Sequence, residues 1–230
     1  MSRVVDLNAD LGEEVTDDAG LLALVTSANV ACGYHAGTVA TMRAVCAEAA
    51  RLGVRVGAQV SYADREHFGR VARDVPAALL SEQVADQVGT LAAIASASGT
   101  AVTYLKPHGA LYHRVVDDEV QAGAVLAGSG DLPVLGLPGG RLLSLAAAAG
   151  RRTHTEGFPD RAYDARGGLV PRTEPGAVLD DPVLIAARAL DLAQRVDSVC
   201  VHGDTPGAVA HARAVRAALE GAGLTVRAFG

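Results

Sequence analysis

Short runs of apolar and β-branched residues alternate along this chain with longer stretches that are rich in alanine and leucine. The short runs predict strands and the longer stretches predict helices, because their apolar positions follow the periods of these two structures. In the last long stretch Val209, Ala212, Val215 and Leu219 recur at helical spacing and form one apolar stripe. Alternation of this kind is typical of right-handed strand–helix–strand units that build a parallel sheet.

The predicted strands cover residues 4–8, 29–32, 54–59, 102–106, 133–137, 153–157, 198–202 and 225–229. The predicted helices cover residues 19–26, 39–51, 76–98, 119–127, 140–149, 182–195 and 206–220. Polar residues follow nearly every predicted strand. In a barrel they gather at the carboxyl ends of many strands, whereas in an open sheet they gather near one switch point. The pattern therefore predicts a (β/α) barrel whose strand number can be irregular, with residues 1–230 as a single domain.

The composition excludes several classes of function and says less about the fold. Half of the 230 residues are apolar, which is enough for a sizeable core, and aromatic residues make up only 3%. A net charge of −6 and the scarcity of aromatic residues argue against a nucleic-acid partner, which requires a basic face or stacking platforms. We see no bilayer-spanning apolar run, no signal-peptide core and no disulfide framework among three scattered cysteines. We expect a cytoplasmic protein with no membrane partner.

Lysine occurs once, as Lys106, although arginine occurs 19 times. Lys106 ends a predicted strand and shares a face with His108, while Pro107 removes a backbone donor and helps to end the sheet. A cation beside an imidazole suits an anionic or carbonyl substrate, because the lysine stabilises charge on oxygen while the histidine transfers a proton. The alternative is that Lys106 is a chance survivor of an arginine-biased composition.

The first predicted strand leads into Asp6, Asn8 and Asp10, which alternate with apolar residues. Alternate side chains of a strand share a face, so the three could together orient a water or bind a cation. For Asp6 alone, a turn-capping role is the better interpretation.

The second predicted strand runs into Cys32-Gly33-Tyr34-His35-Ala36-Gly37. The glycines allow a positive φ or a close approach to a ligand, and His35 lies on this bend. Cys32 could be a nucleophile served by His35, but a lone cysteine in an apolar strand is more often a small core residue.

The densest polar cluster extends from Glu156 to Leu169, where two arginines and three acids surround a glycine pair. Arg161 or Arg166 could bind a carboxylate or phosphate through its guanidinium fork, whereas the alternative is an ion-paired surface loop. A later strand ends in His202-Gly203-Asp204, which is again a polar pair on one face. The phosphate-binding loop, the dinucleotide turn, the His-Glu-x-x-His helix and the Gly-x-Ser-x-Gly elbow are all missing from the sequence.

Four of these runs together resemble the LamB/YcsF family over essentially the whole chain. They are Asp6-Leu7-Asn8-Ala9-Asp10-Leu11-Gly12-Glu13, Asn29-Val30-Ala31-Cys32-Gly33-Tyr34-His35-Ala36-Gly37, Lys106-Pro107-His108-Gly109-Ala110-Leu111-Tyr112 and Val201-His202-Gly203-Asp204. One departure concerns the third strand, where the family often has a histidine at the position of Gln59. That change weakens the case for this position as an acid, base or metal ligand.

The resemblance implies a seven-stranded, TIM-like barrel related in shape to polysaccharide deacetylases. It also implies cleavage of 5-oxo-L-proline to L-glutamate, coupled to ATP hydrolysis and carried out with B and C subunits. ATP with Mg²⁺ would be a co-substrate handled largely by those partners, which fits the missing phosphate loop. We therefore expect little or no activity from the isolated chain.

On the resemblance and the strand-end placement together, we predict two sets of site residues and no metal ligand. The predicted catalytic residues are Asp10, His35, Lys106 and His108. The predicted substrate-binding residues are Asn8, Asn29, Glu156, Asp160, Arg161, Arg166, His202 and Asp204. We expect the catalytic residues to converge in one pocket at the carboxyl end of the barrel, with Asn8 and His202 nearby.

Two other functions remain open from the sequence. One is a metal-dependent, deacetylase-like hydrolase that uses Asp10, His35 and His108 as ligands and leaves a position for water. The other is a regulator that binds a lactam or a sugar without turning it over.

Overall fold

A computed structural model of the chain describes residues 3–15, 17–165 and 167–229. The strands are β1 (Val4–Leu11), β2 (Ser27–Ala31), β3 (Arg55–Val60), β4 (Val102–Pro107), β5 (Val134–Gly136), β6 (Thr153–Gly157), β7 (Ser198–Val201) and β8 (Thr225–Val226). The helices are α1 (Asp18–Leu22), α2 (Val39–Leu52), α3 (Ala77–Ala97), α4 (Gly109–Asp117), α5 (Glu119–Gly128), α6 (Arg141–Ala148), α7 (Pro182–Leu192) and α8 (Ala208–Gly221). A short 3₁₀ helix, η1, covers Arg65–His67.

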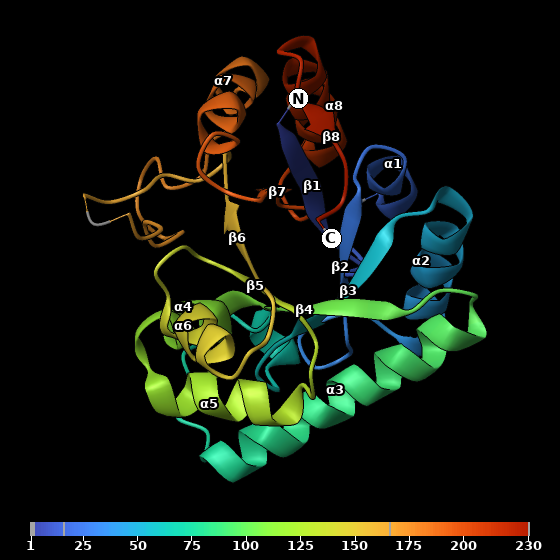
Figure 1. Cartoon of the computed structure of the whole chain (residues 1–230), viewed down its shortest axis with the longest axis vertical. Coiled ribbons are helices and arrows are strands. Elements are labelled where there is room, and N and C mark those ends of the chain that lie inside the picture. The colour runs from blue at the N-terminus through green and yellow to red at the C-terminus, as the bar shows by residue number, and fades with distance from the viewer. Residues whose placement is uncertain (1–2, 16, 166, 230) are drawn as a thin grey trace.

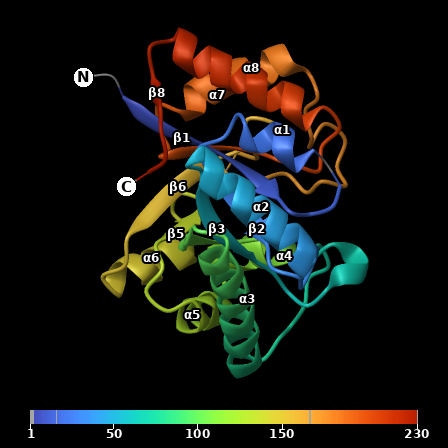
Figure 2. The same ribbon diagram turned by 90° about the vertical axis from the view of Figure 1, so that its right-hand side faces the viewer.

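The strands form a closed parallel barrel, as the sequence predicted. Each strand from β1 to β7 pairs with the next, and β1 also pairs with β7, so seven strands complete the ring. β8 lies outside the ring and pairs with Val4 and Val5 at the start of β1. Figure 1 shows helices on the outside of the strands, and in Figure 2 α7 and α8 lie side by side along one flank.

The two faces of the strands differ sharply in chemistry. On β1, Val5, Leu7, Ala9 and Leu11 are fully buried in the apolar cluster between the barrel and the helices. Because side chains alternate along a strand, Asp6, Asn8 and Asp10 point into the barrel instead. The barrel interior therefore contains a polar network, and apolar packing against the helices stabilises the ring from outside.

Most predicted elements agree with the structure to within a few residues, and two helices differ. The predicted helix 19–26 ends at Leu22, because Thr26 turns back and its amide donates to the carbonyl of Leu7. α4 was not predicted, although its buried residues Leu111, Tyr112 and Val115 follow a helical period. Among the described residues, no helix is both long and apolar enough to cross a membrane.

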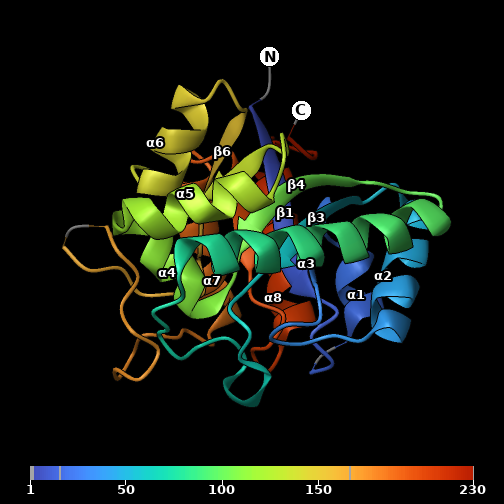
Figure 3. The same ribbon diagram turned by 90° about the horizontal axis from the view of Figure 1, so that it is seen from below.

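Two long loops cover the carboxyl ends of the strands, one between β3 and α3 and one between β6 and α7. Figure 3 shows them at the end of the molecule opposite the two termini. Gly109, which starts α4 with a φ of +60°, allows the first loop to approach closely. A Cβ at this position would meet the carbonyl oxygen of Gly69 at 2.4 Å, and that same carbonyl accepts a hydrogen bond from Ala110.

Candidate active site

Lys106 lies inside the barrel mouth between two carboxylates. Its Nζ is 2.9 Å from Glu156 Oε2 on β6 and 3.2 Å from Asp10 Oδ1 on β1, and it is also 3.1 Å from Cys200 Sγ. Burial by itself lowers the pKa of Lys106, but the Asp10 and Glu156 carboxylates outweigh burial and hold that pKa well above its usual value. The only lysine of the chain is thus a buried, charged ammonium group.

Asn8 and Asn29 hold this ion pair in place from below. Asn29 Nδ2 donates to Asn8 Oδ1 at 2.7 Å and to Asp10 Oδ1 at 2.9 Å, and it comes from the neighbouring strand β2. Its own amide oxygen accepts from the Tyr104 hydroxyl at 2.6 Å. Both asparagines are fully buried among protein partners, and the prediction that they bind substrate stays open. Their contacts orient Asp10 and Lys106.

Asp160 and His202 form a second pair above Lys106. Asp160 accepts from the backbone amide of His202 at 3.1 Å and lies 2.9 Å from its Nδ1. Burial alone raises the pKa of Asp160, but the His202 ring and its hydrogen bonds reverse this and lower it. The ring of His202 stacks on Phe158 at 5.0 Å and lines the same pocket as Lys106. A buried carboxylate that holds Nδ1 in this way leaves Nε2 for chemistry.

Two arginines close the rim of the pocket. Arg70 and Arg172 both pair with Asp204, Arg70 through a short contact and Arg172 at 3.5 Å. Burial raises the pKa of Asp204, but the two guanidinium groups outweigh this and lower it. The pocket beneath has a volume of about 40 Å³, which is room for a few waters. A larger ligand therefore requires these ion pairs to move apart.

His35 and His108 stack on each other at one side of the pocket. Their ring centroids are 4.0 Å apart, and the ring of Phe68 meets both edge-on. Glu13 Oε1 lies 3.7 Å from His35 Nε2 and 3.5 Å from His108 Nε2. Gln59 Nε2 donates to the same carboxylate at 3.0 Å. The structure thus brings His35 and His108 to the mouth, as predicted, and adds Glu13 beside them.

Burial determines the charges of this group. It lowers the pKa of His35 to about 4, and it holds the pKa of His108 well below its usual value, with help from His35 and Arg70. Burial, followed by the nearby Asp10 carboxylate, raises the pKa of Glu13 well above its usual value. Both imidazoles are therefore neutral at neutral pH, and each carries a lone pair that a proton or a cation can use.

The remaining predicted residues have less direct roles. Arg161 is 2% exposed, and its guanidinium donates to the carbonyls of Ala177 and Val170, so it stabilises the β6–α7 loop while lining the pocket. Arg166 lies outside the described residues. Cys32 donates its thiol to the Val30 carbonyl, and burial raises its pKa far above the usual value, which favours a core role over a nucleophile.

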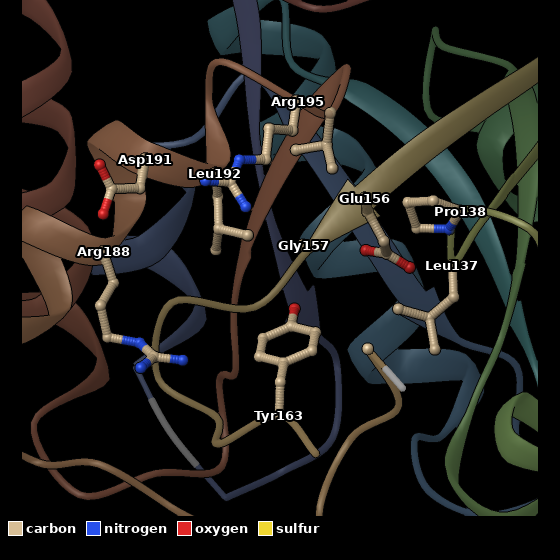
Figure 4. A pocket seen from close by; sticks show the side chains of 11 residues that line it. Leu137, Pro138, Glu156, Gly157, Tyr163, Arg188, Asp191, Leu192 and Arg195 are labelled. Atoms are coloured by element: carbon tan, nitrogen blue, oxygen red, sulfur yellow. The ribbon is translucent and has the colours of Figure 1, made fainter. Parts of the chain in front are cut away.

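A second groove, with a volume of about 590 Å³, has Glu156 in its lining and does not include Lys106. Figure 4 shows Leu137 and Pro138 on one wall, Arg188, Leu192 and Arg195 of the α7 region on the other, and Tyr163 at the base. Glu156 belongs to its lining but is itself fully buried. We place the chemistry in the smaller pocket, because the charged pairs converge there and not in this groove.

Several residues of the site were not predicted from the sequence. Glu13 ends the first run that resembles the family, but only Asp6, Asn8 and Asp10 of that run were considered for the site. Arg70 comes from a loop without apolar periodicity, and no feature of the sequence singles it out. Phe158 stacks on His202 and lies 5.1 Å from Lys106 Nζ, and it was not singled out from the sequence.

Comparison with solved structures supports the fold and the relationship. The lactam utilization protein from Thermus thermophilus superposes with a TM-score of 0.90 at 38% sequence identity, covering 98% of this chain and 99% of that one. The catalytic domain of a peptidoglycan N-acetylglucosamine deacetylase from Eubacterium rectale superposes with a TM-score of 0.56 at 12% identity, covering 100% of this chain and 90% of that one. The second likeness concerns the fold alone.

Sequence relatives match the chain from end to end. The A subunit of 5-oxoprolinase from Streptomyces avermitilis is 55% identical over 249 residues, which cover 98% of this chain and 100% of that protein. The protein of the same name from Mycobacterium leprae is 48% identical and covers 98% of each chain. The LamB/YcsF family model matches residues 5–230. This chain therefore belongs to the LamB/YcsF family.

Proposed function

We propose that this chain is the A subunit of an ATP-dependent 5-oxoprolinase and supplies the site at which the five-membered lactam of 5-oxo-L-proline is opened to L-glutamate. The B and C subunits of the same enzyme would be its partners and would carry out much of the nucleotide chemistry. The observation that carries the proposal is the buried Lys106, held between Asp10 and Glu156 at the mouth of the barrel. The names of the relatives and of the solved lactam utilization protein support the substrate class.

The chemistry requires activation of a stable amide. ATP transfers a phosphoryl group to the lactam oxygen, and water then adds to the ring carbon. The carbon–nitrogen bond breaks as the nitrogen takes up a proton, and a second water releases phosphate from the resulting acyl phosphate. The overall reaction consumes one ATP and two waters and releases glutamate, ADP and phosphate. The protein must therefore stabilise negative charge at the oxygen and move a proton from water toward nitrogen.

Lys106 is suited to the first task. Its ammonium group is desolvated and fixed by hydrogen bonds, so its charge needs no reorganisation when negative charge develops on the substrate. Asp10 and Glu156 already neutralise much of the positive charge of Lys106. Arg70 and Arg172 at the rim supply additional positive charge. Their guanidinium forks suit the carboxylate of 5-oxoproline or a phosphate, once they separate from Asp204.

His202 is suited to the second task. Asp160 holds its Nδ1, and the ring lines the pocket beside Lys106. A carboxylate that orients an imidazole in this way fixes its tautomer and stabilises the imidazolium that forms. The prediction that His108 transfers the proton stays open. Glu13 Oε1 lies 3.5 Å from His108 Nε2. This distance is longer than the 2.9 Å between Asp160 and Nδ1 of His202.

Reconstitution tests the proposal. The chain is combined with the B and C subunits of a bacterial 5-oxoprolinase, and glutamate and ADP are measured together. We expect both products in equal amounts with the full set, and neither product in coupled form when this chain is omitted. Ligand binding without turnover, with every partner present, would instead favour a regulator.

A further inference from the structure

Glu13, His35 and His108 bring one carboxylate oxygen and two imidazole nitrogens together under Phe68. The three ligand atoms all lie within 4.8 Å of one another. The oxygen is 3.7 Å from His35 Nε2 and 3.5 Å from His108 Nε2. In a tetrahedral site with bonds of about 2.0–2.1 Å, neighbouring ligand atoms lie about 3.3 Å apart. The carboxylate needs to approach each ring by only a few tenths of an ångström.

Buried polar atoms without partners gather around the same point. Within the described part of the chain, both ring nitrogens of His35, Nδ1 of His108 and Oε1 of Gln59 have no hydrogen-bond partner. These residues are between 0% and 8% exposed, so bulk solvent does not satisfy them. Buried polar groups are nearly always hydrogen-bonded, and each exception costs about 1–3 kcal/mol. Unpaired ring nitrogens beside a buried carboxylate are the surroundings that a bound cation would use.

We propose that Glu13, His35 and His108 form a binding site for a divalent transition-metal cation such as Zn²⁺, with Gln59 holding the Glu13 carboxylate through its Nε2. Imidazole nitrogen with one carboxylate suits Zn²⁺ and its neighbours, whereas Mg²⁺ and Ca²⁺ prefer oxygen ligands alone. Asp10, which the sequence offered as a ligand beside the two histidines, is engaged by Lys106 and Asn29. Glu13 takes its place.

The histidine rings are the part of the site that must move. They stack with an interplanar angle of 18°, and a cation must lie close to the plane of each ring that binds it. Binding therefore tilts the rings apart beneath Phe68. Three protein ligands leave an open position for a small ligand. Because His108 lines the Lys106 pocket, a cation held here would be next to the place where substrate is expected.

Metal binding by the isolated chain tests the site without partner subunits or turnover, so its outcome is separate from that of the proposed function. The chain is stripped with a chelator and dialysed against Zn²⁺ or Co²⁺. Bound metal is measured by elemental analysis, and the coordination of Co²⁺ by its visible absorption. We expect one cation per chain, a tetrahedral Co²⁺ spectrum and a higher melting temperature with Zn²⁺.

Variants locate the cation. Glu13→Gln and His108→Asn each remove one ligand, and we expect each to weaken affinity by at least the roughly 10–100-fold that loss of an outer-shell partner costs. His67→Gln is the matched control, because His67 also contacts a carboxylate, Asp64 at 2.9 Å, but its side chain lies half-exposed at the surface. It should bind like the parent.

Two results would overturn the site. One is a parent chain that retains far less than one cation, as expected if a buried water uses the same nitrogens. The other is parent-like affinity in Glu13→Gln and His108→Asn. If these variants do not fold, as judged by circular dichroism, the stoichiometry and Co²⁺ spectrum of the parent decide the question alone.

Discussion

The barrel interior has two carboxylate layers that are buried to the same degree and satisfied in opposite ways. At the floor, Asp6 accepts hydrogen bonds from the hydroxyls of Thr26, Ser27 and Ser198. At the mouth, Asp10 and Glu156 share the ammonium group of Lys106. Burial raises the pKa of Asp6 from 3.8 to about 6, although the three hydroxyls act in the opposite direction. The hydroxyls therefore compensate only part of the cost of desolvating this carboxylate.

The difference between the floor and the mouth distinguishes a structural carboxylate, Asp6, from the carboxylates that surround the candidate catalytic Lys106. A carboxylate held by hydroxyls can hold strands together without a compensating cation. The mouth uses the only lysine of the chain, desolvates two acids around it and leaves it at the wall of a pocket. Buried ion pairs are weak evidence for stability, so a chemical role for this one is the hypothesis that the following predictions test.

The largest expected effect comes from removing the cation at the mouth. Lys106→Met keeps most of the length of the side chain but leaves Asp10 and Glu156 buried together without a cation. Loss of one member of a buried ion pair typically destabilises a protein by about 3–5 kcal/mol. Urea unfolding measures the change. If the free energy of unfolding falls by less than about 1 kcal/mol, the ion pair contributes no more than a surface ion pair does. The contrast with Asp6 would then be lost.

The His202–Asp160 pair should affect rate more than stability. We expect His202→Ala to lower kcat of the reconstituted enzyme by about 10²–10⁴-fold, the usual contribution of a general acid–base group. Asp160→Asn should also lower kcat and shift the acidic limb of the pH profile, because it removes the charge that orients the ring. His108→Ala, assayed in parallel, shows which histidine moves the proton. Parent-like kcat in His202→Ala would exclude His202.

Asp6 at the floor should make the stability of the chain depend on pH, and it should have little effect on turnover of the substrate. The pKa of Asp6 in the folded chain, about 6, lies above its usual value of 3.8. Its stabilising contribution is therefore fully present below pH 3.8 and is lost as pH rises through 6. The loss is on the order of 3 kcal/mol. Asp6→Asn should remove this component, so that the variant gains stability relative to the parent as pH rises through this window.

Urea unfolding at several pH values checks the Asp6 prediction. Parallel pH curves for parent and variant would show that Asp6 keeps an ordinary pKa. Coupled activity of Asp6→Asn, measured near neutral pH, should stay close to that of the parent, in contrast to the variants at the mouth.

The smallest expected effect on stability lies at the rim. Arg70 is partly exposed, so Arg70→Gln should change the free energy of unfolding by less than about 1 kcal/mol. If the guanidinium binds substrate, KM should rise while the melting temperature barely moves. An unchanged KM would show that Arg70 only bridges to Asp204.

The sequence predicted the barrel well because the strands and helices carry strong, regular patterns. It also placed Asp10, His35, Lys106 and His108 at strand ends, which a parallel barrel necessarily brings to one mouth. What it could not predict depends on contacts between distant segments. The pairing of Asp160 with His202 joins residues 42 positions apart, and Arg161 is engaged by carbonyls of its own loop.

Glu13 illustrates the same limit at closer range. Its place in the sequence suggested the end of a motif, and only the folded loop shows that it reaches both His35 and His108. α4 was missed because the run Lys106-Pro107-His108-Gly109 is typical of a turn. In the structure β4 runs through Pro107, and the helix begins at Gly109 after the single extended residue His108.

The most direct test of the role of Lys106 is coupled turnover by Lys106→Arg in the reconstituted complex. Arginine keeps the positive charge but replaces a compact ammonium group with a wide planar fork, which does not fit between Asp10 and Glu156 in the same way. Glutamate and ADP are measured together, at a temperature where circular dichroism shows the variant folded. We expect the parent to release both products and the variant to release almost no glutamate. Near-parental coupled activity in Lys106→Arg would contradict a catalytic role for the lysine.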